Sequence, residues 1–214
     1  MLSLKQNEDE ARERLRAFWS GASLGRPALI VEADDPTFVE KPWRGPALDA
    51  KGRDLLPEWY TWMAGEHLRH TVYLAEAMPN AALAWGSHLV LLATLAGGDY
   101  EYHAGSAWIE PMSDVYERPL PRFDPDHTVV RCLDLCLRRI AQEVGDRAYL
   151  NPPALLDAMT TLSMFRGPGA LATDLVDRPE DVRRWCEAGT ALNADAYEHF
   201  WQVAKSLGYG DTST

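Results

Sequence analysis

The sequence predicts an α/β protein with a mostly parallel sheet, and within that class the N-terminal part of a (β/α)8 TIM barrel preceded by a helix. Short apolar segments of strand length alternate with longer segments of helical periodicity, the pattern of a parallel sheet covered by helices. No G-x-G-x-x-G and no Walker loop follows a predicted strand, which disfavours nucleotide-binding folds. The chain has 214 residues, whereas a complete barrel needs about 250, so we expect the barrel to be incomplete.

The first expected elements are a helix and a buried strand. Residues 7–20 carry apolar side chains at helical spacing, and glycines follow them. The apolar run 28–31 has the length and the β-branched content of a buried strand. We expect a single partial barrel domain over 1–214, in which 1–25 hold the N-terminal helix and 26–214 hold the first strands and helices.

The later segments continue the alternation. Further strands are expected over residues 81–85, 107–109 and 148–150, and helices over residues 55–77, 88–95, 127–144, 154–164 and 179–207. Proline or glycine follows most of these segments, as expected where a helix or strand ends. Because the last helix leads toward a further strand, we expect strands beyond those in this chain.

Composition excludes several classes of partner. The chain carries 32 acidic and 21 basic side chains, a net charge of −11, which disfavours nucleic acid and anionic membrane surfaces. No apolar run approaches the roughly 18 residues of a membrane helix, and the charged N-terminus lacks the apolar core of a signal peptide. Three cysteines without an export signal fit reduced thiols. We therefore expect a cytoplasmic protein that binds neither nucleic acid nor membrane.

Three segments carry a resemblance to a known family. Residues 14–32 read RLRAFWSGASLGRPALIVE, residues 76–98 read EAMPNAALAWGSHLVLLATLAGG, and residues 155–184 contain FRGPGALATDLVDRPEDVRR. These segments resemble the uroporphyrinogen decarboxylase-like superfamily of (β/α)8 barrels, and the third is the most specific. The resemblance spans nearly the whole chain, but the family's later strands and C-terminal active-site histidine have no counterpart.

The resemblance implies a changed substrate. The decarboxylases hold an acidic tetrapyrrole with an arginine-containing segment after the first strand, and here that segment is Glu32 to Asp35. Acids beside such a substrate would repel it by roughly 4 kcal/mol per close pair. The family's substrate-orienting aspartate falls at Ser87, and its active-site tyrosine falls near Asp157 or Ala158. The resemblance thus implies a lyase-like protein that acts on a small, non-anionic substrate and is inactive without the rest of the barrel.

Three alternatives to this function remain open. A second branch of the superfamily comprises corrinoid-dependent methyltransferases, whose zinc ligands belong to the half that has no counterpart here. An acidic pocket would tolerate their neutral or cationic methyl donors. The present residues predict no cofactor and no metal. The chain could also be a truncated gene product without function, or a non-catalytic interaction module whose open sheet edge pairs with a C-terminal barrel half or with a second copy.

Candidate site residues follow from the rule that barrel chemistry comes from strand carboxyl ends and the loops after them. The catalytic candidates are three acids: Glu32, Glu110 and Asp157. The substrate-binding candidates are polar or aromatic: Asp34, Trp85, Ser87, His88, Trp108 and Asn151. Burial would have to raise the pKa of such acids for acid–base chemistry. The alternative is that they are solvated loop residues or helix caps.

Several clusters are interpreted as structural. The segment 66–70, EHLRH, lacks the spacing of H-E-x-x-H, and histidines at the end of a helix complement its dipole. Cys132 and Cys136 lie four residues apart on a predicted helix and are expected to be buried thiols. Trp85 and Trp108, at predicted strand ends, either line a pocket or fill the barrel interior.

Overall fold

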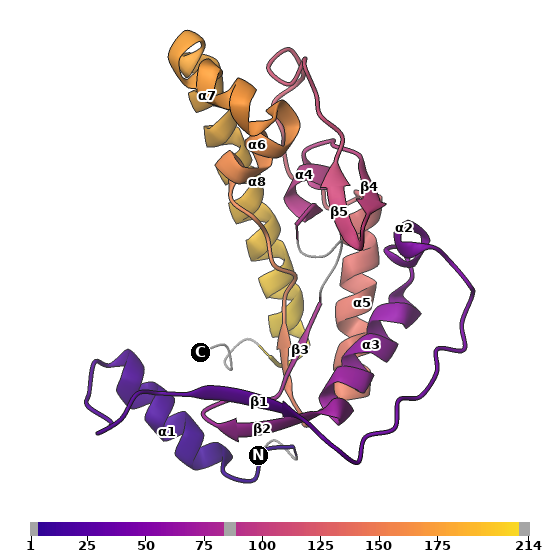
Figure 1. Cartoon of the computed structure of the whole chain (residues 1–214), viewed down its shortest axis with the longest axis vertical. Helices are drawn as coiled ribbons and strands as arrows, with labels where there is room; N and C mark the ends of the chain where they lie inside the picture. The colour runs from indigo at the N-terminus through magenta and orange to yellow at the C-terminus, as the bar shows by residue number, and fades with distance from the viewer. Residues whose placement is uncertain (1–3, 84–88, 210–214) are drawn as a thin grey trace.

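The computed structural model describes residues 4–83 and 89–209. Its helices are α1 (Glu8–Trp19), α2 (Ala50–Arg53), α3 (Pro57–His70), α4 (Leu91–Leu95), α5 (Thr128–Val144), α6 (Ala158–Arg166), α7 (Pro168–Asp177) and α8 (Pro179–Ser206). Its strands are β1 (Ile30–Asp34), β2 (Thr71–Ala75), β3 (Asn80–Ala82), β4 (Tyr100–His103), β5 (Ser106–Ile109) and β6 (Tyr149–Asn151). Figure 1 shows α1 and the β1–β2 ribbon at one end of the molecule, and α6, α7 and the β4–β5 hairpin at the other.

The described strands form three two-stranded sheets. The β1–β2 and β4–β5 pairs are antiparallel, and only the β3–β6 pair is parallel. The prediction of a mostly parallel sheet is therefore wrong for two of the three pairs. The described residues form no closed barrel, and the assignment to a partial barrel stays a prediction.

The first strand differs most from expectation. It runs over Ile30–Asp34, and all five of its residues are exposed, whereas a buried strand was expected over 28–31. Its partner β2 lies inside the segment predicted to be one long helix to residue 77. That helix ends at His70, because Thr71, Val72 and Tyr73 are β-branched or aromatic and favour the extended chain.

A buried carboxylate holds the ribbon in place. The Glu76 side chain, next to β2, accepts hydrogen bonds from Arg26 Nη2 (2.5 Å) and from the Leu29 backbone N–H (2.8 Å). Arg14 of α1 approaches the same carboxylate at 3.3 Å. The hydrogen bond from Arg26 lowers the pKa of Glu76 to about 2. Lys5 Nζ donates to the Ala75 carbonyl at 2.7 Å, so both the ribbon and α1 are held by polar contacts.

The main core lies between α3, α5 and α8. Helix α5 buries residues at every third or fourth position, and Leu133, Leu137 and Ile140 are fully buried. Phe200 of α8 belongs to the same cluster. Cys136 is buried as expected, whereas Cys132 is only half-buried.

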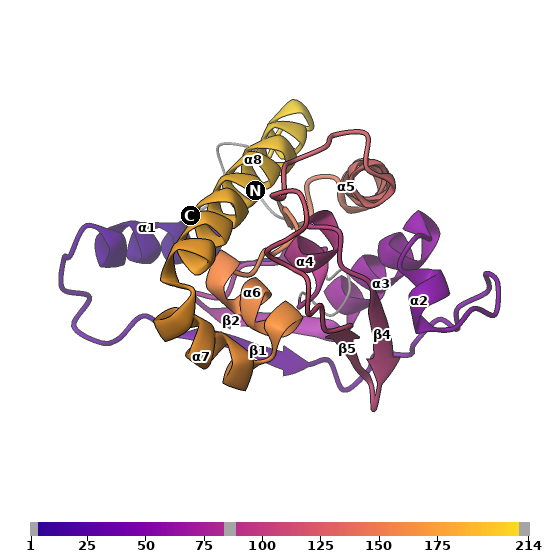
Figure 2. The ribbon, with the colours of Figure 1, turned by 90° about the horizontal axis from the view of Figure 1, so that it is seen from above.

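A second, smaller core supports the upper end of the molecule. Phe165 of α6 packs edge-on against Trp185 of α8 at 5.8 Å. In Figure 2, α6 lies beside α4, α7 and α8, all of which it contacts. Helix α7 was not predicted as a separate helix. It begins at Pro168, directly after Gly167, whose φ of 76° ends α6.

A buried acid links the β4–β5 hairpin to α2 and α3, beside the hydrogen bond that Lys51 Nζ donates to the Tyr100 carbonyl at 2.7 Å. Asp54, between α2 and α3, accepts hydrogen bonds from Tyr60 (2.9 Å), Tyr100 (2.6 Å) and Tyr102 (3.1 Å). Burial raises the pKa of both Tyr60 and Tyr100, so these phenols stay protonated and keep donating. Three donors satisfy a carboxylate that would otherwise be costly to bury.

Candidate functional site

The acids expected after the first strand lie in the exposed ribbon. Glu32 is paired with Tyr73 across the β1–β2 ladder, and Asp34 Oδ1 lies 3.3 Å from His70 Nε2. Both side chains are exposed. The burial that would adapt Glu32 to acid–base chemistry is therefore missing in this chain.

The candidates on the third predicted strand lie in the β4–β5 hairpin. Trp108 is 61% exposed, so it neither fills a barrel interior nor lines an enclosed pocket here. Glu110 follows β5, and its backbone N–H donates to the Asp99 carbonyl at 3.0 Å. Its side chain is exposed as well. Trp85, Ser87 and His88 lie outside the described residues.

The last two candidates belong to β6 and to the start of α6. Asn151 ends β6, and its Nδ2 lies 3.5 Å from Asn80 Oδ1 on the neighbouring strand. Asp157 caps α6 by accepting hydrogen bonds from the Thr160 hydroxyl (2.6 Å) and backbone N–H (2.8 Å). These two bonds lower the pKa of Asp157, which disfavours it as a general acid.

The described candidates do not converge on one site. Strand β1, which carries Glu32 and Asp34, lies near the lower end of the molecule in Figure 1, whereas β5, which carries Trp108, lies in its upper half. The feature that most resembles a barrel is the β3–β6 pair. Ala81 and Leu150 are buried in the main core, whereas Ala82 and Asn151 are exposed on the pair.

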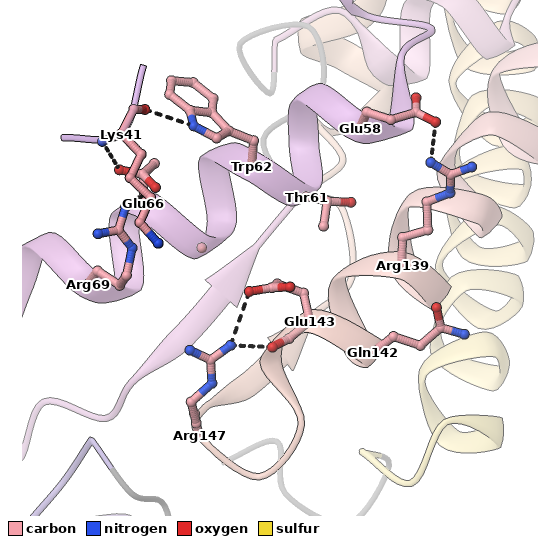
Figure 3. A pocket seen from close by; sticks show the side chains of 11 residues that line it. Lys41, Glu58, Thr61, Trp62, Glu66, Arg69, Arg139, Gln142, Glu143 and Arg147 are labelled. Carbon is pink, nitrogen blue, oxygen red and sulfur yellow. Dashed lines mark hydrogen bonds and ion pairs between the residues drawn. The ribbon is translucent and has the colours of Figure 1, made fainter. Parts of the chain in front are cut away.

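Sequence reasoning missed a charged groove between α3 and α5. It has a volume of about 760 Å³, within the usual range for small-molecule sites. One face of α3, one face of α5, the loop before α3 and the turn after α5 line it: Lys41, Glu58, Thr61, Trp62, Gly65, Glu66, Arg69, Arg139, Gln142, Glu143 and Arg147. Figure 3 shows these side chains around the groove. The signal in the sequence was charged residues spaced three and four apart on both helices.

Ion pairs engage the three carboxylates of the groove. Glu58 pairs with Arg139 across the two helices, and Glu66 pairs with Arg69 along α3. Glu143 Oε1 lies 3.4 Å from the Arg147 guanidinium, which also donates to the Glu143 carbonyl. Figure 3 marks the Glu58–Arg139 and Glu143–Arg147 pairs with dashed lines.

Three tryptophans pack together beside the groove. The rings of Trp43, Trp59 and Trp62 lie 4.9 to 5.7 Å apart in all three pairs. Trp62 Nε1 donates to the Lys41 carbonyl at 3.0 Å, and Trp43 Nε1 donates to the Pro46 carbonyl at 3.1 Å. The tryptophans thereby hold the loop that forms one wall of the groove.

The described residues lack both a cluster of potential metal ligands and a helix that could span a membrane. No group of three or more potential metal ligands gathers in ranges 4–83 and 89–209. In the EHLRH segment, Glu66 binds Arg69 and the Lys41 backbone N–H, and His70 faces Asp34. No helix in those ranges combines the length and the apolarity that crossing a membrane requires.

The comparisons with known proteins found no match for this chain. No family model matches the chain, and neither a curated protein nor a solved structure matches it.

Proposed function

We propose that this chain is part of a uroporphyrinogen decarboxylase-like (β/α) barrel whose catalytic site forms only when further strands pair with β3 and β6. The observation that carries the proposal is the parallel β3–β6 pair, with α3 and α5 packed beside it. No described strand pairs with the outer edge of either strand. Parallel pairs of this kind occur almost only in larger sheets covered by helices.

The exposed polar groups at the strand ends support a small, non-anionic substrate. In barrels the reacting groups come from strand carboxyl ends, and Asn151 occupies that position here. Its amide lies beside that of Asn80, so the pair offers neutral donors and acceptors instead of a fixed charge. The candidate acids Glu32, Glu110 and Asp157 lie far apart in space in this structure. Catalysis would therefore require side chains that the further strands contribute.

The outer edge of β3 offers a direct test. Tyr149 N–H donates to the Pro79 carbonyl at 2.9 Å, so the backbone of residue 79 faces β6. Along a strand, the backbone N–H and C=O groups of successive residues point alternately to one neighbouring strand and to the other. The N–H groups of Asn80 and Ala82 therefore point away from β6. Proline at position 82 removes one outward donor without removing a β3–β6 hydrogen bond, and proline is tolerated at such edges.

We expect the wild-type chain to associate with itself or with a co-expressed segment that supplies further strands. Light scattering after size-exclusion chromatography should show that Ala82→Pro abolishes this association, whereas Ala82→Val, which keeps the N–H, retains it. Circular dichroism checks that both variants stay folded. A wild-type monomer with one cooperative unfolding transition and protected β3 amides would contradict the proposal.

A second candidate function, a non-catalytic interaction module, is favoured by the apolar surface of the β1–β2 ribbon. Leu74 is 46% exposed, and Val31 and Val72 are each 39% exposed; Val31 lies opposite Leu74 in the ladder, so the three side chains share one face. Clustered apolar side chains on a surface mark interaction sites. Under this alternative, Val31→Lys together with Leu74→Lys abolishes association and Ala82→Pro leaves it intact, which is the opposite of the result expected for the barrel.

A further inference from the structure

The floor of the α3–α5 groove is a glycine that the fold does not require. Gly65 lies inside α3, where glycine destabilises a helix relative to alanine. A Cβ at this position would come no closer than 3.8 Å to its nearest neighbour, Glu143 Oε1, which is ordinary contact. Gly189 of α8 differs, because a Cβ there would lie 2.9 Å from the Ala158 Cβ. Packing thus explains Gly189 but does not explain Gly65.

The absence of a side chain at Gly65 keeps the groove open. Glycine commonly occurs where a ligand approaches the backbone closely. The neighbouring lining residues Thr61, Trp62 and Arg69 follow at helical spacing on the same face of α3. The unfilled volume over Gly65 therefore faces side chains that can bind a ligand.

The charges around this volume favour an anion. Four cationic side chains and three carboxylates line the groove, in a chain whose net charge is −11. Arginines already engage all three carboxylates. Within the described ranges, Lys41 Nζ makes no hydrogen bond or ion pair, although its charge helps to lower the pKa of Glu66 and its backbone binds Glu66 and Trp62. The groove therefore carries one more cation than it has carboxylates.

A flat apolar surface adjoins the cations. A second cavity of about 330 Å³ shares Lys41 and Trp62 with the groove and is also lined by Trp43 and Arg44. The indole N–H of Trp62 is already bonded to the Lys41 carbonyl, so the ring presents apolar surface. Aromatic side chains with a few placed polar groups are typical of small-molecule sites.

We propose that the α3–α5 groove binds a small aromatic anion, with a phosphate or carboxylate near Lys41 and Arg69 and its ring against Trp62 over Gly65. This site shares no residue with the strand ends of the proposed barrel, so the proposal stands independently of that function. Arg69 would share its guanidinium between Glu66 and the ligand.

Four small molecules distinguish the contribution of the ligand's charge to binding from the contribution of its aromatic ring. Titration calorimetry with the full chain should detect phenyl phosphate and benzoate binding, with weaker binding of inorganic phosphate, which lacks the ring. Benzylamine, which has the ring and the opposite charge, should not bind. Tighter binding of phenyl phosphate than of benzoate would identify phosphate as the anionic group, and the reverse order would identify carboxylate. Equal binding of benzylamine and phenyl phosphate would overturn the proposal.

Filling the groove distinguishes this site from adventitious binding. Gly65→Gln should weaken phenyl phosphate binding by about tenfold or more, since the new side chain occupies the ligand's volume. The matched control is Gly169→Gln in α7, where a Cβ meets no atom within 4 Å, and it should leave binding unchanged. Lys41→Gln should weaken binding by about fivefold and reduce its salt dependence. Unchanged affinity in both Gly65→Gln and Lys41→Gln, with both variants folded, would refute the site.

Discussion

At the scale of single residues, Glu76 makes the clearest electrostatic contribution to folding. Its buried carboxylate accepts hydrogen bonds from Arg26 and Leu29 and lies close to Arg14. We expect Glu76→Gln to lower the free energy of unfolding at pH 7 by about 2 kcal/mol, the scale of hydrogen bonds to a charged group. Urea denaturation followed by circular dichroism measures this change, and Glu13→Gln at an exposed position of α1 serves as the matched control.

The pH dependence of stability follows from the same residue. The folded pKa of Glu76 is lowered from 4.5 to about 2. A carboxyl with a depressed folded pKa stabilises the protein fully above the unfolded value and loses that contribution as the pH falls through the folded value. The wild-type chain should therefore lose this stability between pH 4.5 and 2, and Glu76→Gln should lack that component. Parallel pH profiles for the two proteins would exclude the role assigned to Glu76.

A helix cap is the role that the structure assigns to Asp157. Asp157→Ala should lower stability by about 1 kcal/mol, because the backbone N–H of Thr160 loses its acceptor. Asp157→Asn should be nearly neutral, since asparagine caps a helix comparably well. Thermal unfolding of the two variants measures the difference. An equal loss in both would mean that the charge, and not the cap, carries the stabilisation.

At the scale of elements, two helical glycines should respond to alanine with opposite signs. Gly65→Ala should stabilise α3 by about 0.5–1 kcal/mol, because the space is free and alanine restricts the unfolded chain. Gly189→Ala should destabilise the protein by roughly 1–3 kcal/mol, because its Cβ would lie 2.9 Å from Ala158 Cβ and 3.0 Å from the Trp185 ring. Chemical denaturation tests both. A destabilising Gly65→Ala would show that the groove floor is more tightly packed than the structure indicates.

Elements with strong local signals were predictable from the sequence. Helices α5 and α8 were expected over 127–144 and 179–207 and occupy Thr128–Val144 and Pro179–Ser206, because their periodicity and end signals agree. The β1–β2 ribbon was predicted only in part: a strand was expected over 28–31, but residues 71–75 were assigned to a helix although Thr71, Val72 and Tyr73 favour the extended chain. Their pairing with β1 depends on a distant segment and could not be predicted from local sequence.

The candidate site shows the same division between local and long-range information. Capping was among the roles expected for the acids after the strands, since aspartate before a helix is a local signal. The groove combines side chains from Lys41, from α3 and from α5, and no local pattern indicates that these segments meet. Gly65 was also overlooked, because an unneeded glycine is recognised only when the space around its Cα is known.

At the scale of the whole molecule, stability should be concentrated in the three packed helices. The amides of Leu133, Leu137 and Ile140 belong to a buried helix and should exchange with solvent only by global unfolding. The β1–β2 ribbon buries Tyr73 alone among its side chains, so its amides should exchange through local opening. Hydrogen exchange followed by NMR or mass spectrometry resolves the two classes.

Hydrogen exchange measured at several protein concentrations tests whether a second copy of the chain covers the β1–β2 ribbon. A second copy bound to the exposed Val31 and Leu74 surface would protect β1 amides increasingly as concentration rises, because association follows mass action. Protection at the outer edge of β3, where the Asn80 and Ala82 N–H groups point away from β6, would instead indicate strand addition to the parallel pair. If β1 amides were as protected as those of α5 at every concentration, the ribbon would belong to the cooperative core, contrary to the exposure of its five residues.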